Sequence, residues 1–143
     1  VCFFPFPYQD ELLETMIADG EGLANNFIPF HTIISIFSDA ITYHAYGTLC
    51  YQFFGNILLF IPLGFSLYCY LKEDKKFIRM LCSVIAITVF VEIWQWVFNA
   101  MLQVNYRCVD VDDIILNTIG GILGFCIASF GISMLKSFFG KNK

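Results

Sequence analysis

Three long apolar runs, separated by short polar segments, dominate the chain after residue 50. They cover about residues 51–71, 77–99 and 113–135. Each is close to the ~20 residues that an α-helix needs to cross the hydrocarbon core of a bilayer. Because backbone polar groups in lipid have to be satisfied within the segment, each run is predicted to form a transmembrane helix.

A shorter amphipathic segment precedes these runs, at about residues 29–45. Pro29 suits the first turn of a helix, where a missing N–H loses no hydrogen bond. Apolar residues then follow at helical spacing, namely Phe30, Ile33, Ile34, Phe37 and Ile41. This pattern predicts an amphipathic helix that lies at the membrane surface or packs across the bundle.

The predicted fold is an all-α membrane protein, a small helical transmembrane bundle of three spans with one amphipathic interfacial helix. A single domain is expected over residues 1–143. Residues 1–6 (VCFFPF) are interpreted as the tail of a further helix or of a signal segment, and a fourth span preceding this chain is expected. Composition supports the membrane class, because charged residues make up 14 % of the chain, against about 25 % in soluble domains.

Charge is distributed unevenly along the chain, whose formal net charge is −4. The basic residues gather between the first two spans and after the third: Lys72, Lys75, Lys76, Arg79, Lys136, Lys141 and Lys143. Alternating spans put both groups on one side, which the positive-inside rule identifies as cytoplasmic. A multi-pass plasma-membrane protein with a cytoplasmic C-terminus is therefore predicted. The absence of a basic face argues against a nucleic-acid partner.

Polar side chains interrupt the spans near the end opposite to the basic residues. A carboxylate in the membrane costs about 2.5–3.5 kcal/mol on insertion scales, so such residues usually face a protein interior or a wet cavity and mark a functional site. The candidate ligand-binding residues are Asn56, Glu92, Gln95, Arg107, Asp110, Asp113 and Asn117. A polar pocket toward the outer leaflet is predicted.

Helical periodicity brings these residues onto shared faces. Glu92 and Gln95 lie three residues apart on one face of the second span. At about 100° per residue, Asp113 and Asn117 form a stripe on the third span. Asp110 joins that stripe if the helix begins one turn earlier. Two helices are thus predicted to present polar side chains to each other.

The first span adds a third polar stripe, because Gln52 and Asn56 lie four residues apart near the same end. Asp112, in contrast, is predicted to point away from the stripe of the third span. Gly120 and Gly124 form a small-xxx-small pattern, which predicts a close contact with a neighbouring helix.

Arg107 is the expected counter-charge of the acids, because a guanidinium forms paired hydrogen bonds with carboxylates. Glu92, Asp110 and Asp113 nevertheless outnumber it. The excess is resolved if one acid is protonated, if a cation binds, or if a cationic group of a ligand docks there. Asp110 and Asp113 are the candidate ligands of a divalent cation, although the sequence lacks the glycine and the distal glutamate of a calcium loop.

Three classes of function stay open at this point. The cluster binds the head group of a ligand, or it catalyses a reaction on a membrane lipid, or it only holds the bundle together. For a transferase or hydrolase, Glu92 is the candidate general base and Arg107 the group that stabilises developing charge. Asp110 and Asp113 complete the set of catalytic candidates. A purely structural cluster would consist of a Glu92–Arg107 ion pair and interhelical hydrogen bonds.

Four blocks, in order from about residue 25 to 125, are similar to the VanZ-like family of bacterial membrane proteins. They are NFIPF at 26–30, NILLFIPLGF at 56–65, EIWQ at 92–95 and RCVDVDDIILNTIGGILG at 107–124. Phe27 stands where the family usually has Leu, and Asn105-Tyr106 where a Gly commonly precedes the Arg. Neither departure removes a candidate site residue.

The resemblance implies a small protein of the bacterial plasma membrane, usually with a helix before the NFIPF block. The family is named for a protein that gives low-level resistance to teicoplanin, a lipid-anchored glycopeptide antibiotic. The expected partners are therefore membrane lipids, a lipid-linked cell-wall precursor or a lipoglycopeptide. The expected role is in glycopeptide resistance or envelope homeostasis.

Overall fold

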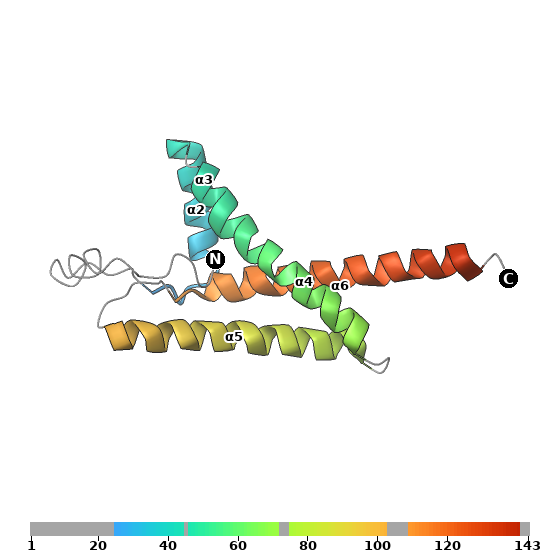
Figure 1. Ribbon diagram of the computed structural model, residues 1–143. Helices are drawn as coiled ribbons and strands as arrows, with labels where there is room; N and C mark the ends of the chain where they lie inside the picture. The colour runs from blue at the N-terminus through green and yellow to red at the C-terminus, as the bar shows by residue number, and fades with distance from the viewer. Residues whose placement is uncertain (1–24, 45, 72–74, 103–108, 141–143) are drawn as a thin grey trace.

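The computed structural model describes residues 25–44, 46–71, 75–102 and 109–140, and Arg107 and residues 1–6 lie outside these ranges. The helices, in order, are α2 (His31–Tyr43), α3 (Tyr46–Thr48), the π-helical η1 (Leu49–Phe54), α4 (Gly55–Tyr70), α5 (Lys76–Leu102) and α6 (Val111–Gly140) (Figure 1). The described ranges contain no strand, only an isolated bridge between Asn26 and Asp110. The predicted all-α fold is confirmed.

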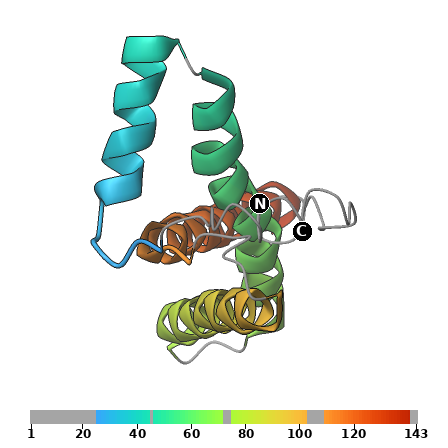
Figure 2. The same cartoon turned by 90° about the vertical axis from the view of Figure 1, so that its left-hand side faces the viewer.

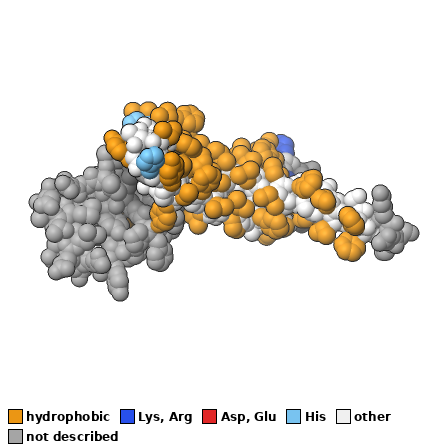
Figure 3. All heavy atoms as spheres, turned by 90° about the horizontal axis from the view of Figure 1, so that it is seen from above, with side chains coloured by type: hydrophobic (Ala, Val, Ile, Leu, Met, Phe, Trp, Pro, Cys, Tyr) orange, Lys and Arg blue, Asp and Glu red, His pale blue; other side chains and the backbone are white. Residues whose placement is uncertain are grey.

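Three helical stretches are long and apolar enough to cross a membrane: Tyr46–Tyr70, which joins α3, η1 and α4, Lys76–Met101, and Val111–Phe139. Hydrophobic side chains predominate on the described part of the face shown in Figure 3. Large rings lie on the surface, and Phe90 is 64 % exposed. A surface this rich in large apolar side chains suits lipid, not water. The protein is therefore an all-α membrane protein, as predicted.

Glycines let α4 and α6 cross with their backbones in direct contact. A Cβ added at Gly120 would collide with the carbonyl group of Ile57, and one at Gly124 with that of Ile61. On α4, a Cβ at Gly64 would collide with the backbone of α6. Because lipid tails are as apolar as the side chains, helices in a membrane associate through such close packing. The predicted small-xxx-small contact is confirmed.

α5 runs antiparallel to α6 and is shifted along it. Val84 of α5 lies against Gly121, and Glu92 reaches the start of α6. Beyond the start of α5, α6 continues toward the C-terminus without a neighbouring helix in the described structure (Figure 1). Phe60 and Met80 join Val84 in a small apolar core between α4, α5 and α6.

α2 stands beside the first part of the long α3–η1–α4 helix (Figure 2). The Phe37 ring makes an edge contact with a phenylalanine ring of η1 at a centroid distance of 5.2 Å. The buried residues of α2 are Ile36 and Ala40, whereas Ile34 and Ile41 of the predicted apolar face are exposed. That face was therefore only partly right. In a membrane, exposed isoleucines are stable in contact with hydrocarbon. The side of α2 that packs against the protein is therefore decided by how well the side chains fit, not by their apolarity.

The glycine contacts predict a specific loss of stability. Gly120→Ala should lower the free energy of unfolding by about 1–3 kcal/mol or more, because the facing carbonyl of α4 cannot yield without moving the helix. Gly131→Ala is the matched control, since a Cβ there meets nothing within 4 Å. The control should be neutral or stabilising by up to about 1 kcal/mol through helix propensity. Thermal unfolding in detergent, followed by circular dichroism, measures both. Equal stabilities of the two variants would contradict the backbone contact.

Candidate functional site

The start of α6 is the point at which the polar side chains converge. Oδ1 of Asp110 accepts a hydrogen bond from the backbone N–H of Asp112 at 2.8 Å. This is an N-cap, which satisfies one of the backbone donors left open at the start of a helix. Asp112 and Asp113 place two more carboxylates in the first turn, beside the positive end of the helix dipole. The helix terminus therefore explains why three acids lie close together at this position.

Asn26 ties the segment before α2 to the start of α6. Its backbone N–H donates to the carbonyl of Val109 at 2.9 Å, and its carbonyl accepts from the N–H of Val111 at 3.1 Å. Its side-chain Nδ2 donates to Oδ1 of Asp110 at 2.9 Å and to Oγ1 of Thr32 at 3.0 Å. One buried asparagine thus joins two segments that lie 84 residues apart.

Asp112 holds the start of α2. It is fully buried, and its two oxygens accept hydrogen bonds from the backbone N–H groups of Phe30, at 2.5 Å, and Ile33, at 3.1 Å. Phe30 has a left-handed backbone with φ 67°, and α2 has no side-chain cap at that residue. A carboxylate from α6 therefore takes the role that an N-cap side chain normally has.

Asn56 links α4 to the same place. Its Nδ2 donates to Oδ1 of Asp113, and the side chain is buried. The predicted alignment of Gln52 with Asn56 is wrong, because Gln52 is exposed. Gln52 lies in η1, and the wider turn of a π-helix rotates its side chains away from the α-helical register.

Glu92 brings α5 into the cluster. Its Oε2 accepts a hydrogen bond from the backbone N–H of Asp110 at 3.0 Å. The side chain is 5 % exposed. Its second oxygen, Oε1, is buried and has no hydrogen-bond partner in the described part of the chain. The carboxylate is thus oriented by one oxygen and leaves the other available.

Asn117 lies one turn after Asp113 on α6 and is fully buried. Neither its Nδ2 nor its Oδ1 has a hydrogen-bond partner among the described residues, and the same is true of Oδ1 of Asn56. Leaving a buried polar group unpaired costs about 1–3 kcal/mol. Such groups in a native protein call for an explanation, and a bound molecule is one.

The face of α5 that carries Glu92 is polar over its C-terminal half. Thr88, Gln95 and Asn99 on this face are all buried. Toward the basic end of the helix the buried residues of the same face are Val84 and Met80. The interior of the bundle is therefore polar at one end and apolar at the other.

The described partners of the buried acids are all neutral. They are backbone N–H groups and the amides of Asn26 and Asn56. The predicted counter-charge, Arg107, lies outside the described residues. In the part of the chain that the structure describes, no group of three or more His, Cys, Asp or Glu side chains is arranged to hold a metal ion.

The structure thus joins four of the predicted site residues through hydrogen bonds: Asn56, Glu92, Asp110 and Asp113. It buries Gln95 and Asn117 as well. Their role in binding a ligand stays a prediction. Sequence reasoning missed Asn26 and Asp112 as parts of the cluster. A usable signal was the start of α2, which needs acceptors for its N–H groups and offers none of its own.

Fold and site together define a polytopic helical membrane protein whose helices enclose a buried cluster of carboxylate and carboxamide side chains. The family model described as VanZ/LLP1 matches residues 1–134. The chain therefore belongs to the VanZ/LLP1 family. No curated protein and no solved structure matches it.

Asp112 is predicted to be a structural residue of this site. Asp112→Asn should destabilise the protein by about 1.5–3 kcal/mol, because an amide replaces one of two charged acceptors at the start of α2. Asp39→Asn removes the same charge from the middle of α2, where no hydrogen bond of the carboxylate is present in the described structure, and should leave stability unchanged.

Amide hydrogen exchange at Phe30 and Ile33 gives the local readout. Exchange should accelerate in Asp112→Asn and not in Asp39→Asn. Unchanged protection in both variants would show that α2 starts without help from α6.

Proposed function

We propose that the cluster binds an amine-bearing polar head group at the outer leaflet. The candidate ligands are a membrane lipid, a lipid-linked cell-wall precursor and a lipoglycopeptide. Binding would contribute to glycopeptide (teicoplanin) resistance or to envelope homeostasis. The observation that carries the proposal is the set of buried polar atoms without described partners on three helices: Oε1 of Glu92, Oδ1 of Asn56, and both side-chain polar atoms of Asn117.

The chemistry of these atoms favours a donor-rich ligand. Three of the four are acceptors, from Glu92, Asn56 and Asn117, and the remaining one is the Nδ2 donor of Asn117. The nearby acids are hydrogen-bonded only to neutral groups in the described structure. An ammonium group satisfies both features at once, because it supplies three N–H donors and a positive charge.

The closed inner half of the bundle favours binding over passage. Beyond Asn117, α4 and α6 touch through the backbones at Gly120 and Gly124. Phe60, Met80 and Val84 fill the remaining space. Among the described residues, buried polar side chains do not continue through this half, so a polar ligand that enters from one side would stop at the cluster.

The depth of the cluster suits a lipid-linked ligand. If Lys76 marks the cytoplasmic boundary, Glu92 lies about 24 Å along α5, at ~1.5 Å per residue. The hydrocarbon core is about 30 Å thick. The cluster would therefore lie just below the outer boundary, within reach of head groups of the outer leaflet.

A second candidate function is a transferase or hydrolase that acts on a membrane lipid. It is favoured by Glu92, whose Oε2 is fixed by Asp110 while Oε1 is available, as a general base requires. Turnover would alter one lipid species, whereas binding alone would leave lipid composition unchanged. Lipid analysis of cells with and without the protein separates the two functions.

Glu92→Gln tests the role of the charge. Glutamine keeps an oxygen for the N–H of Asp110, so the fold should persist. Loss of a charge-assisted hydrogen bond should weaken binding about 10- to 100-fold. Nanodiscs are titrated with teicoplanin or supplied with phosphatidylethanolamine. Binding is followed by the fluorescence of the two tryptophans, Trp94 and Trp96, which follow Glu92 on α5 by two and four residues.

The same variant is compared in cells by the minimal inhibitory concentration of teicoplanin at matched protein levels. Asp39→Asn is the control, because it removes a carboxylate outside the cluster. If Glu92→Gln and the wild type respond alike to both probes and in cells, the binding site is not where we place it.

Asn117→Leu should separate binding from stability. Leucine has a similar volume and removes two buried polar atoms that have no described partner, so unfolding should become harder by about 1–3 kcal/mol. Binding should weaken in the same protein, because the ligand loses its partners. A structural role of Asn117 predicts the opposite, a loss of stability. Thermal unfolding and the fluorescence titration, performed on one preparation, decide between these outcomes.

A further inference from the structure

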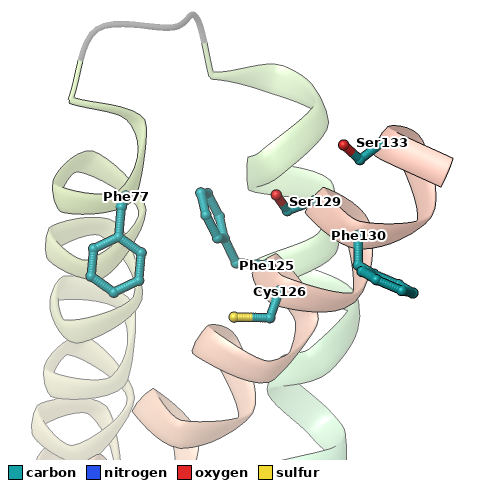
Figure 4. Close-up of a pocket in the computed structure, with 6 residues that line it drawn as sticks. All are labelled: Phe77, Phe125, Cys126, Ser129, Phe130 and Ser133. Atoms are coloured by element: carbon teal, nitrogen blue, oxygen red, sulfur yellow. The ribbon is translucent and has the colours of Figure 1, made fainter. Parts of the chain in front are cut away.

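A second site lies at the opposite end of the bundle, far from the polar cluster. A pocket of about 340 Å³ opens between α5 and α6, within the range of roughly 300–1,000 Å³ that ligand pockets occupy. Its lining residues are Phe77, Phe125, Cys126, Ser129, Phe130 and Ser133. Figure 4 shows Phe77 of α5 on one side and the α6 residues on the other.

The lining of this pocket combines rings and hydroxyls along α6. Phe125, Ser129 and Ser133 follow at four-residue intervals, which places them on one face of the helix. Phe130 lies between the two serines in the sequence, and Ser133 is the lining residue nearest the C-terminal, basic end of α6. A lining of rings and hydroxyl groups suits a ligand that has both an acyl chain and a polar head group.

A positive charge is held beside the pocket. Nζ of Lys76 lies 3.8 Å from the centre of the Tyr68 ring. The Tyr68 ring in turn contacts Phe125 at 5.0 Å, and Phe125 contacts Phe77 at 5.6 Å. Aromatic rings from α4, α6 and α5 thus form a chain of edge contacts, and the Tyr68 ring at one end of it holds the ammonium group of Lys76.

Charge complementarity identifies the occupant. Lys75, Lys76 and Arg79 lie at the start of α5, and Lys136 follows Ser133 by less than one turn on α6. In the described ranges 55–71, 75–91 and 114–140 there is no Asp or Glu. With Glu73 and Asp74, which precede Lys75 in the sequence, residues 72–79 still carry four basic against two acidic side chains, a formal net charge of +2. We propose that this pocket binds an anionic phospholipid from the leaflet at the basic end, with an acyl chain against Phe77 and Phe125 and the phosphate near Ser129, Ser133 and Lys76.

This site is independent of the polar cluster. It differs from general lipid attraction because Lys76 is stacked on Tyr68, whereas its neighbour Lys75 is exposed and has no such ring contact among the described residues. Basic residues near an anionic surface strengthen association by about fivefold each. Lys76, whose ammonium group is held on a ring, should therefore contribute more to phospholipid binding than the exposed Lys75.

Native mass spectrometry of the delipidated full chain, titrated with phosphatidylglycerol or phosphatidylcholine, tests the proposal. Phosphatidylglycerol should be retained at least about fivefold more than phosphatidylcholine. Lys76→Gln should remove most of this preference, and Lys75→Gln, with the same change in net charge, should remove little. Equal losses in the two variants, or equal retention of the two lipids by the wild type, would overturn the site.

Ser129→Trp fills the pocket and should reduce phosphatidylglycerol retention several-fold. Phe90→Trp adds the same ring at an exposed position of α5 outside the pocket and should not reduce it. Photo-crosslinking of the unmodified chain with a diazirine-labelled phosphatidylglycerol gives a readout that needs no variant. Crosslinks should concentrate between residues 125 and 133. An even distribution of crosslinks over the lipid-facing surface would overturn the site, because it would show lipid that only solvates the helices. A dimer that is lost in Ser129→Trp would also overturn it, because it would show that a second copy of the chain occupies the pocket.

Discussion

Backbone N–H groups at the start of a helix need acceptors, and in a membrane water cannot supply them. Both α6 and α2 begin in the polar cluster, and aspartates of the VDVDD run serve both helices. Asp110 caps its own helix, and Asp112 caps α2 from outside. Because Asn26 and Glu92 then bond to Asp110, the arrangement of the other helices depends on how this one terminus is satisfied. Asp113 adds the contact to α4.

The interior of the bundle has two halves that differ in polarity and packing. One is dry and closed, because glycines on α4 and α6 bring the backbones together and Phe60, Met80 and Val84 fill the rest. The other is polar, with oxygen and nitrogen atoms left over after the helix termini are served. A rigid base beside the polar cluster suits the binding that we propose, since preorganised groups lose little freedom when a ligand arrives.

The membrane class, the glycine contact and most members of the cluster were predictable from the sequence, because hydropathy and helical spacing act within single helices. Glu92, Asp113 and Asn117 stood out as polar residues in apolar runs. The cap of α2 by Asp112 was not predictable, since it joins residues about 80 positions apart and depends on the left-handed backbone of Phe30. Gln52 was misplaced because the pattern assumes α-helical turns, and the π-helical segment changes the register. The packed face of α2 was only partly predicted for another reason: in lipid, apolar side chains are stable both on the surface and in the interior.

The length of α6 has a consequence for the surrounding bilayer. Between Asp113 and Lys136 the uncharged part of α6 has 22 residues, or about 33 Å of helix at ~1.5 Å per residue, close to the roughly 30 Å of hydrocarbon. A bilayer of another thickness would create a hydrophobic mismatch, which is relieved by tilting the helix or by deforming the membrane around it. Since α4 is joined to α6 backbone to backbone, a tilt of α6 carries α4 with it. Bilayer thickness therefore influences the angle at which these helices hold the polar cluster.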